Sequence, residues 1–171
     1  MAAIDRWSDE PAWLDFTARA VTDALAGMPE KTKVLFTAHS LPERLLVGDG
    51  YPAELAASAR AIARRAGLAS WAGWGIAWQS AGATREVWRG PDVLRVIDDL
   101  ADTGRSEGVL VCPQGFVTDH LEVGYDLDVE ARARAEARGL AFGRTRTVDD
   151  DPAVMGALAD RVIAAADTLR V

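Results

Sequence analysis

Residues 33–42 read KVLFTAHSLP, a short and mostly apolar run followed by a loop that opens with His39. An apolar run of this length between turn signals is typical of a strand buried in the middle of a parallel sheet. In an open α/β sheet, the carboxyl ends of the strands border the crevice in which ligands bind. The run therefore predicts a buried strand over 33–38 that delivers His39 to the edge of a site.

Helical and strand patterns alternate on both sides of this run. Before it, the apolar spacing predicts an amphipathic helix at about 9–27. Such alternation is typical of right-handed βαβ units. We therefore expect the α/β class, with a doubly wound four-stranded parallel sheet, and we expect residues 1–171 to form one domain. After the run, the predicted strands are 73–78, 108–112 and 140–145, and the predicted helices are 52–66, 91–101, 116–138 and 152–168.

The composition narrows the class of partner. The chain has 171 residues, of which 49% are hydrophobic, so it can bury one core. Its formal net charge of −7 disfavours nucleic-acid binding, which needs clustered Lys and Arg. No stretch approaches the ~18 consecutive apolar residues of a membrane span, and the opening MAAIDRWSDE does not resemble a signal peptide. We expect no nucleic-acid partner, no transmembrane segment and a cytoplasmic location.

Several conspicuous residues are better explained by packing than by chemistry. Cys112 is the single cysteine and lies within an apolar run, so we predict a buried strand residue. Trp71, Trp74 and Trp78 belong to or flank the strand at 73–78, and we predict that they are core residues. The chain lacks the P-loop pattern G-x-x-x-x-G-K and a complete G-x-G-x-x-G, so the sequence does not support a nucleotide site.

A second polar segment, CPQGFVTDHLEVGYDLDVE at 112–130, follows the third predicted strand and contains His120, the other of the two histidines. Within it, Glu122, Asp126 and Glu130 are spaced by four. On a regular α-helix four residues advance about 6 Å and about 400°, so these carboxylates would form a ladder on one face. Gly124 inside the helix predicts a local π-bulge. The ladder has two interpretations, a solvated acidic face or a path for metal cations. The histidines at strand ends favour the metal path, whose predicted ligands are His39, His120, Glu122, Asp126 and Glu130.

Four motifs carry a resemblance to a known family: TAHSLP at 37–42, WQS at 78–80, W-x-G-P at 88–91 and the segment at 112–130. In order and spacing they resemble the C-terminal half of the ferrochelatases, the porphyrin iron chelatases of haem synthesis. The resemblance implies a Rossmann-like chelatase half with a four-stranded parallel sheet. It also implies that the porphyrin lies in a cleft between two such halves, of which this chain matches one.

The resemblance implies roles for individual residues. His39 matches the metal-binding histidine of the family and Glu122 its carboxylate partner, so both are implied catalytic residues, and which one takes the proton stays open. Asp126 and Glu130 match an acidic series that conducts or holds divalent cations, and His120 matches the first position of an H-x-E pair. The residues expected at the porphyrin are Ser40, Leu41, Pro42 and Trp88, with Arg44 and Arg89 as candidates for its propionates.

The implied reaction is insertion of ferrous iron, as a substrate, into coproporphyrin III or protoporphyrin IX. Imidazole and carboxylate groups suit Fe²⁺ as ligands, and either can accept a proton near neutral pH. We expect no iron–sulfur cluster, because no cysteine cluster follows the last helix. Since half of the cleft is missing, we expect a homodimer or a separate N-terminal half, with apolar surface exposed around Leu41 and Trp88. The alternative is a non-catalytic domain that binds porphyrin or metal.

Overall fold

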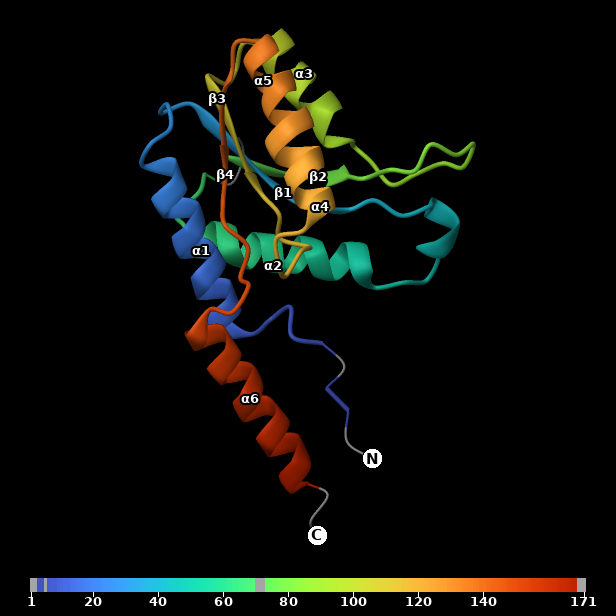
Figure 1. Ribbon diagram of the computed structural model, residues 1–171, viewed down its shortest axis with the longest axis vertical. Helices are drawn as coiled ribbons and strands as arrows, with labels where there is room; N and C mark the ends of the chain where they lie inside the picture. Colours follow the sequence, from blue (N-terminus) through green and yellow to red (C-terminus); the bar gives the residue numbers. More distant parts are fainter. Residues whose placement is uncertain (1–2, 5, 70–72, 169–171) are drawn as a thin grey trace.

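A parallel sheet forms the centre of the computed structural model, which describes residues 3–4, 6–69 and 73–168 (Figure 1). Within these residues the strand order is β2-β1-β3-β4, and every neighbouring pair is parallel. The winding reverses at β1, because β2 lies on one side of it and β3 and β4 on the other. This switch point is where α/β sheets bind ligands. The strands are β1 (Thr32–His39), β2 (Trp74–Gln79), β3 (Gly108–Cys112) and β4 (Ala141–Arg144).

Helices cover both faces of this sheet, as Figure 1 shows. On one face lie α1 (Pro11–Leu25) and α2 (Tyr51–Arg65). On the other face lie α3 (Val93–Thr103) and the helical segment over residues 121–137. The last helix, α6 (Pro152–Asp167), contacts α1. The predicted doubly wound α/β class is therefore confirmed, and no helix in the described ranges is long and apolar enough to cross a membrane.

Alternation along the strands places two large core clusters on opposite faces of the sheet, and Ala38, Leu55 and Trp78 form a smaller third cluster. Phe36 of β1 packs toward α1 and α2, whereas its neighbour Leu35 packs toward α3 and the 121–137 segment. Both side chains are fully buried, as expected for a strand covered on both faces. Trp78 is also buried, and Trp74 packs edge-on against Phe36, so the core prediction for these two tryptophans is confirmed. Trp71 lies outside the described residues.

The helix predicted at 116–138 begins later than its sequence pattern indicated. Residues 116–120 are not helical, with a bend at 117–118, and the helix starts at Leu121 because His120 caps it. His120 has an extended backbone, and its Nδ1 accepts a hydrogen bond from the Glu122 amide at 3.2 Å. The first helix of the chain likewise spans 11–25 rather than about 9–27, since Glu10 supplies its cap and Pro11 its first residue.

The segment that follows contains a π-helix between two short α-helices. It consists of α4 (Leu121–Val123), the π-helix η2 (Gly124–Ala131) and α5 (Arg132–Ala137). The expected irregularity at Gly124 is therefore confirmed, and it extends over eight residues. A π-helix has slightly more than four residues per turn, so side chains spaced by four still lie close to one face of it. The predicted regular α-helix is therefore replaced by a π-helix over Gly124–Ala131, and the ladder of Glu122, Asp126 and Glu130 stays a prediction.

Candidate active site

His39 ends β1 at the switch point of the sheet, with 37% of its side chain exposed. Its Nδ1 lies 2.5 Å from the carbonyl oxygen of Ser40. A carbonyl only accepts hydrogen bonds, so the proton of a neutral imidazole sits on Nδ1. The lone pair of the ring is then on Nε2, where it can bind a metal ion or accept a proton. The Ser40 amide donates to the Gln79 carbonyl at 2.7 Å, which ties this arrangement to β2.

Glu122, at the start of α4, approaches the free nitrogen of this ring. Its Oε2 lies 3.7 Å from His39 Nε2, and 56% of its side chain is exposed. A neutral imidazole nitrogen and a carboxylate oxygen are both acceptors, and 3.7 Å is too long for a hydrogen bond. The pair can therefore share one proton or one cation between them. The two residues come from the ends of different chain segments, and the fold brings them together as predicted.

Asp126 is held at the same edge of the sheet by Ser80. Ser80 directly follows β2 and has φ = 61°, a left-handed backbone that a serine seldom adopts. Its hydroxyl donates to the Asp126 carboxylate. Because Gln79 pairs with His39 in the sheet register, this bond fixes the π-helix over the strand end next to His39. The sequence motif WQS includes Ser80, but nothing in its spacing indicated the contact with Asp126.

The other predicted metal ligands are not gathered at this point. Glu130 is exposed further along η2, and the ring of His120 packs against Phe116 with centroids 5.3 Å apart. Across the described ranges, no three or more His, Cys, Asp or Glu side chains are arranged to hold a metal ion. Cys112 is fully buried, and burial raises the pKa of its thiol to about 12, so it stays protonated. Of the predicted metal ligands, His39 and Glu122 are therefore the two whose side chains lie close together.

Two loops pack together beside this pair and form a ridge, defined here as residues 40–50 and 80–91 (Figure 1). Pro42 and Trp88 form an isolated antiparallel bridge, and the Arg89 amide donates to the Leu41 carbonyl at 2.9 Å. The Ser40 hydroxyl donates to the Arg89 carbonyl at 2.8 Å. Ser40 and Pro42 are buried and Leu41 and Trp88 half-buried, so these four predicted porphyrin contacts are largely engaged in holding the ridge.

The arginines of the ridge differ from expectation. Arg89 pairs with Glu43 at 3.3 Å, and Arg44 pairs with Glu86, so both predicted propionate ligands already have carboxylate partners. Apolar surface is exposed around Leu41 and Trp88 as expected, through their neighbours Leu45, Val47 and Val87. Leu121 and Tyr125, in the helical segment over residues 121–137, are exposed as well.

Asp149 is a further residue whose role the sequence did not reveal. Its Oδ1 accepts from the Thr118 hydroxyl at 2.7 Å and from the Asp119 amide at 3.1 Å, while its own amide donates to the Val117 carbonyl at 2.8 Å. The hydrogen bond from Thr118, followed by that from Asp119, holds the pKa of Asp149 below its ordinary value. These bonds fix the loop that leads into His120 and Glu122.

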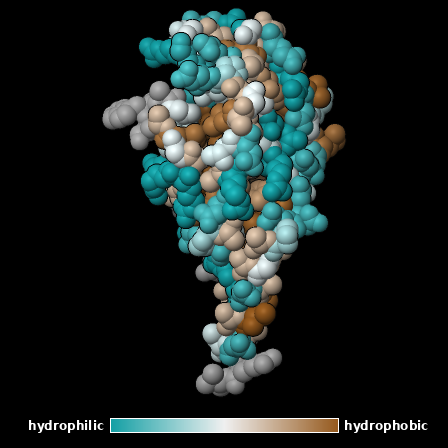
Figure 2. Space-filling view, turned by 90° about the vertical axis from the view of Figure 1, so that its left-hand side faces the viewer, coloured by the Kyte–Doolittle hydropathy of each residue, from teal (hydrophilic) through white to brown (hydrophobic). Residues whose placement is uncertain are grey.

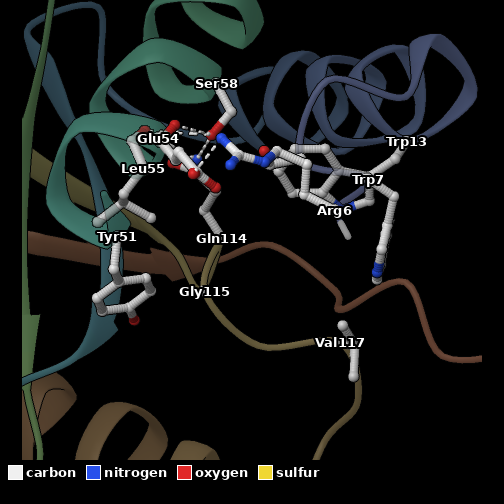
Figure 3. Close-up of a pocket in the computed structure, with 11 residues that line it drawn as sticks. Arg6, Trp7, Trp13, Tyr51, Glu54, Leu55, Ser58, Gln114, Gly115 and Val117 are labelled. Carbon is white, nitrogen blue, oxygen red and sulfur yellow. Dashed lines mark hydrogen bonds and ion pairs between the residues drawn. The ribbon is translucent and has the colours of Figure 1, made fainter. Parts of the chain in front are cut away.

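A cavity of about 320 Å³ lies between α1, α2 and the loop after β3 (Figure 3). Trp7 and Trp13 form one wall and Tyr51 another, with Gln114 between them. The amide of Gln114 donates to Ser58 and to the Leu55 carbonyl, while its buried Oε1 has no hydrogen-bond partner among the described residues. His39 and Glu122 do not line this cavity, so it is separate from the pair described above.

Comparison with known proteins assigns the chain to a family. The family model named Ferrochelatase matches residues 1–166. The chain is 42% identical over 163 residues to the ferrochelatase of Herpetosiphon aurantiacus, and 39% identical over 165 residues to the coproporphyrin III ferrochelatase of Geobacillus kaustophilus. These matches cover 92% and 94% of this chain but 52% and 51% of the relatives, so the chain spans about half their length. The resemblance of its motifs is thereby confirmed: the chain belongs to the ferrochelatase family.

Proposed function

We propose that this chain supplies one wall of a chelatase that inserts ferrous iron into a porphyrin, the other wall coming from a second half. The observation that carries the proposal is the approach of Glu122 to the free Nε2 of His39, at 3.7 Å, on the ligand-binding edge of the sheet. Family membership supports the same reaction, since relatives are named ferrochelatases. The other parts of the proposal are catalysis by these two residues and a cytoplasmic location.

The chemistry requires two protons to leave the pyrrole nitrogens and the iron to lose its water ligands. His39 presents an unprotonated Nε2, because the Ser40 carbonyl holds the ring proton on Nδ1. Glu122 offers a carboxylate beside it, so the pair can take a pyrrole proton or guide the cation. We assign Asp126 and Glu130 to cation supply, since both lie on η2 after Glu122. The proposed role of His120 is chiefly to cap α4, the helix that begins at Leu121.

Coproporphyrin III is the porphyrin we propose, because relatives from Geobacillus kaustophilus and Halalkalibacterium halodurans carry the name coproporphyrin III ferrochelatase. The exposed apolar side chains of Val87, Leu121 and Tyr125 would face the macrocycle, and Trp88 stands beside Val87 on the ridge. Iron enters this scheme as a substrate.

A metallation assay tests the proposal. The chain is joined to the segment of the Herpetosiphon aurantiacus ferrochelatase that it does not match, and loss of porphyrin fluorescence is followed anaerobically with Fe²⁺. His39→Ala should abolish metallation, and Glu122→Gln should slow it on the order of 10²-fold. Glu130→Gln is the matched carboxylate control, whose rate should recover at higher Fe²⁺. Binding of coproporphyrin III without metallation by the unaltered chimera would favour the non-catalytic binding domain instead.

A further inference from the structure

Arg144, the last residue of the edge strand β4, is unusually buried for an arginine. It lies two residues after Phe142, so both side chains point to the face that the helical segment over residues 121–137 covers. Charged side chains belong mostly to the surface, which is largely hydrophilic on the side shown in Figure 2. Only 16% of the Arg144 side chain is exposed, against 34% or more for every other arginine with an ion pair in the described ranges. A cation buried to this extent requires charged partners.

The guanidinium group of Arg144 has two such partners, one in a loop and one in a helix. Its Nη1 and Nη2 donate to the two carboxylate oxygens of Asp119 at 2.9 and 3.3 Å. Its Nε donates to Asp128 Oδ1 at 2.8 Å. The contact with Asp119 is the bidentate fork that arginine forms and lysine cannot. Nη1 also donates to the Thr145 carbonyl at 3.2 Å, which holds the group at the end of its own strand.

These two aspartates lie on either side of the carboxylate of the candidate site. Asp119 belongs to the loop before the helix, and Asp128 lies within the π-helix η2. Glu122 and the first turn of η2 lie between them in the chain. Arg144 therefore ties both ends of this segment to the same sheet that carries His39.

The position of the Glu122 carboxylate depends on the backbone that carries it. Among the described residues its one polar partner is His39, at 3.7 Å, a distance too long for a hydrogen bond. The backbone that follows is π-helical, a rare conformation that occurs mostly at functional sites. A displacement of about 1 Å at a catalytic group can cost on the order of 10²-fold in rate. A residue that fixes this segment would therefore act on the rate.

We propose that Arg144 is a positioning residue of the metallation, which holds Glu122 beside His39 by clamping Asp119 and Asp128 to the end of β4. The inference rests on the proposed function and adds to it a residue outside the reacting pair. Arg144 contacts neither Glu122 nor His39, so its effect must pass through the segment between the two aspartates.

The histidine rings report on this clamp without reference to catalysis. The chain has two histidines, so a histidine-labelled sample gives two Cε1 signals, and His39→Ala identifies that of His39. Glu122→Gln gives the reference shift for loss of the carboxylate from the ring. Arg144→Lys keeps the positive charge but cannot form the fork, so it should move the His39 signal in the same direction. The double variant should move it no further than Glu122→Gln alone.

Metallation by the chimera is the second measurement. Arg144→Lys should lower kcat about tenfold and change KM for coproporphyrin III by less than about twofold, because Arg144 makes no contact with the ridge. Asp128→Asn removes one anchor and should act in the same direction, so it decides the question if Arg144→Lys does not fold. Arg138→Lys is the matched control, since Arg138 also bridges two aspartates, Asp98 and Asp102, and it should change neither measurement.

Each outcome supports the clamp or overturns it. An unchanged His39 signal in folded Arg144→Lys would overturn the proposal, even if the chimera inserts iron. A rate loss in Arg144→Lys that adds fully to that of Glu122→Gln would also overturn it, because the arginine would then act independently of this carboxylate. The expected shift of the His39 signal, in a chain whose chimera binds porphyrin without metallation, would support the clamp while refuting the proposed function.

Discussion

Ser80 combines an unfavourable backbone conformation with a single polar contact, which is the bond of its hydroxyl to Asp126. A non-glycine residue at φ = 61° persists where the surroundings determine it. The Asp126 carboxylate therefore orders the strand end beside His39, in addition to any role toward cations. This contact joins two of the family motifs, WQS at 78–80 and the segment at 112–130.

A double-mutant cycle measures this contact. Ser80→Ala removes the donor, Asp126→Ala removes the acceptor, and the double variant removes both. Because the bond involves a charged, partly exposed acceptor, we expect a coupling free energy of about 1 kcal/mol in urea unfolding. Ser106→Ala combined with Asp126→Ala is the control pair and should be additive. Additive effects for Ser80 and Asp126 would contradict the proposed ordering.

At the scale of elements, the apolar runs predicted the strands to within about two residues, because each buried strand is a short apolar segment bounded by turn residues. The helical segment over residues 121–137 was predicted to start at 116, five residues before its first residue, Leu121. Its true start depends on the His120 cap and on contacts from residues near 149, which are remote in sequence. The π-helical length was also beyond the pattern, since Gly124 could indicate only a local bulge.

Asp149 gives this element its own test. Asp149 has φ = 45°, so a substitution here changes both the backbone strain and the hydrogen-bond acceptor. Asp149→Ala should lower the free energy of unfolding and speed amide exchange at Asp119, because the acceptor is lost and alanine resists this φ. Asp149→Asn keeps an acceptor and tolerates the conformation, so it should cost less than half as much. Identical losses for the two variants would refute a hydrogen-bonding role.

For the molecule as a whole, the sequence predicted the sheet, its two covered faces and the approach of His39 to Glu122. The strand-end position predicted that His39 lies at the edge of a site, and the resemblance of the motifs implied Glu122 as its partner. The ion pairs of Arg44 with Glu86 and of Arg89 with Glu43 were not predictable, since they depend on how two loops fold against each other. The exposure of one face of α6 was not predictable either, because its apolar residues resemble those of a buried helix.

Global stability should depend on pH through Cys112. Burial raises the pKa of its thiol from 9.0 to about 12 in the folded state, whereas the unfolded chain ionises near the ordinary value. Between these values the unfolded state releases a proton that the folded state keeps, so stability is lost as the pH rises from about 9 to about 12. At pH 10 the loss should be about 1 kcal/mol relative to pH 7. Urea unfolding at both pH values should show this loss in the wild type and not in Cys112→Val.

The ridge beside His39 has a consequence for how the specificity of the protein can change. Its loops are joined in part through the backbone, by the amide of Glu43 to the carbonyl of Val87 and by the amide of Arg89 to the carbonyl of Leu41. These two bonds do not depend on which side chains the loops carry. The exposed positions Leu45, Val47 and Val87 can therefore be randomised in a library while these bonds are kept, which makes them the place to vary the macrocycle that the proposed chelatase accepts.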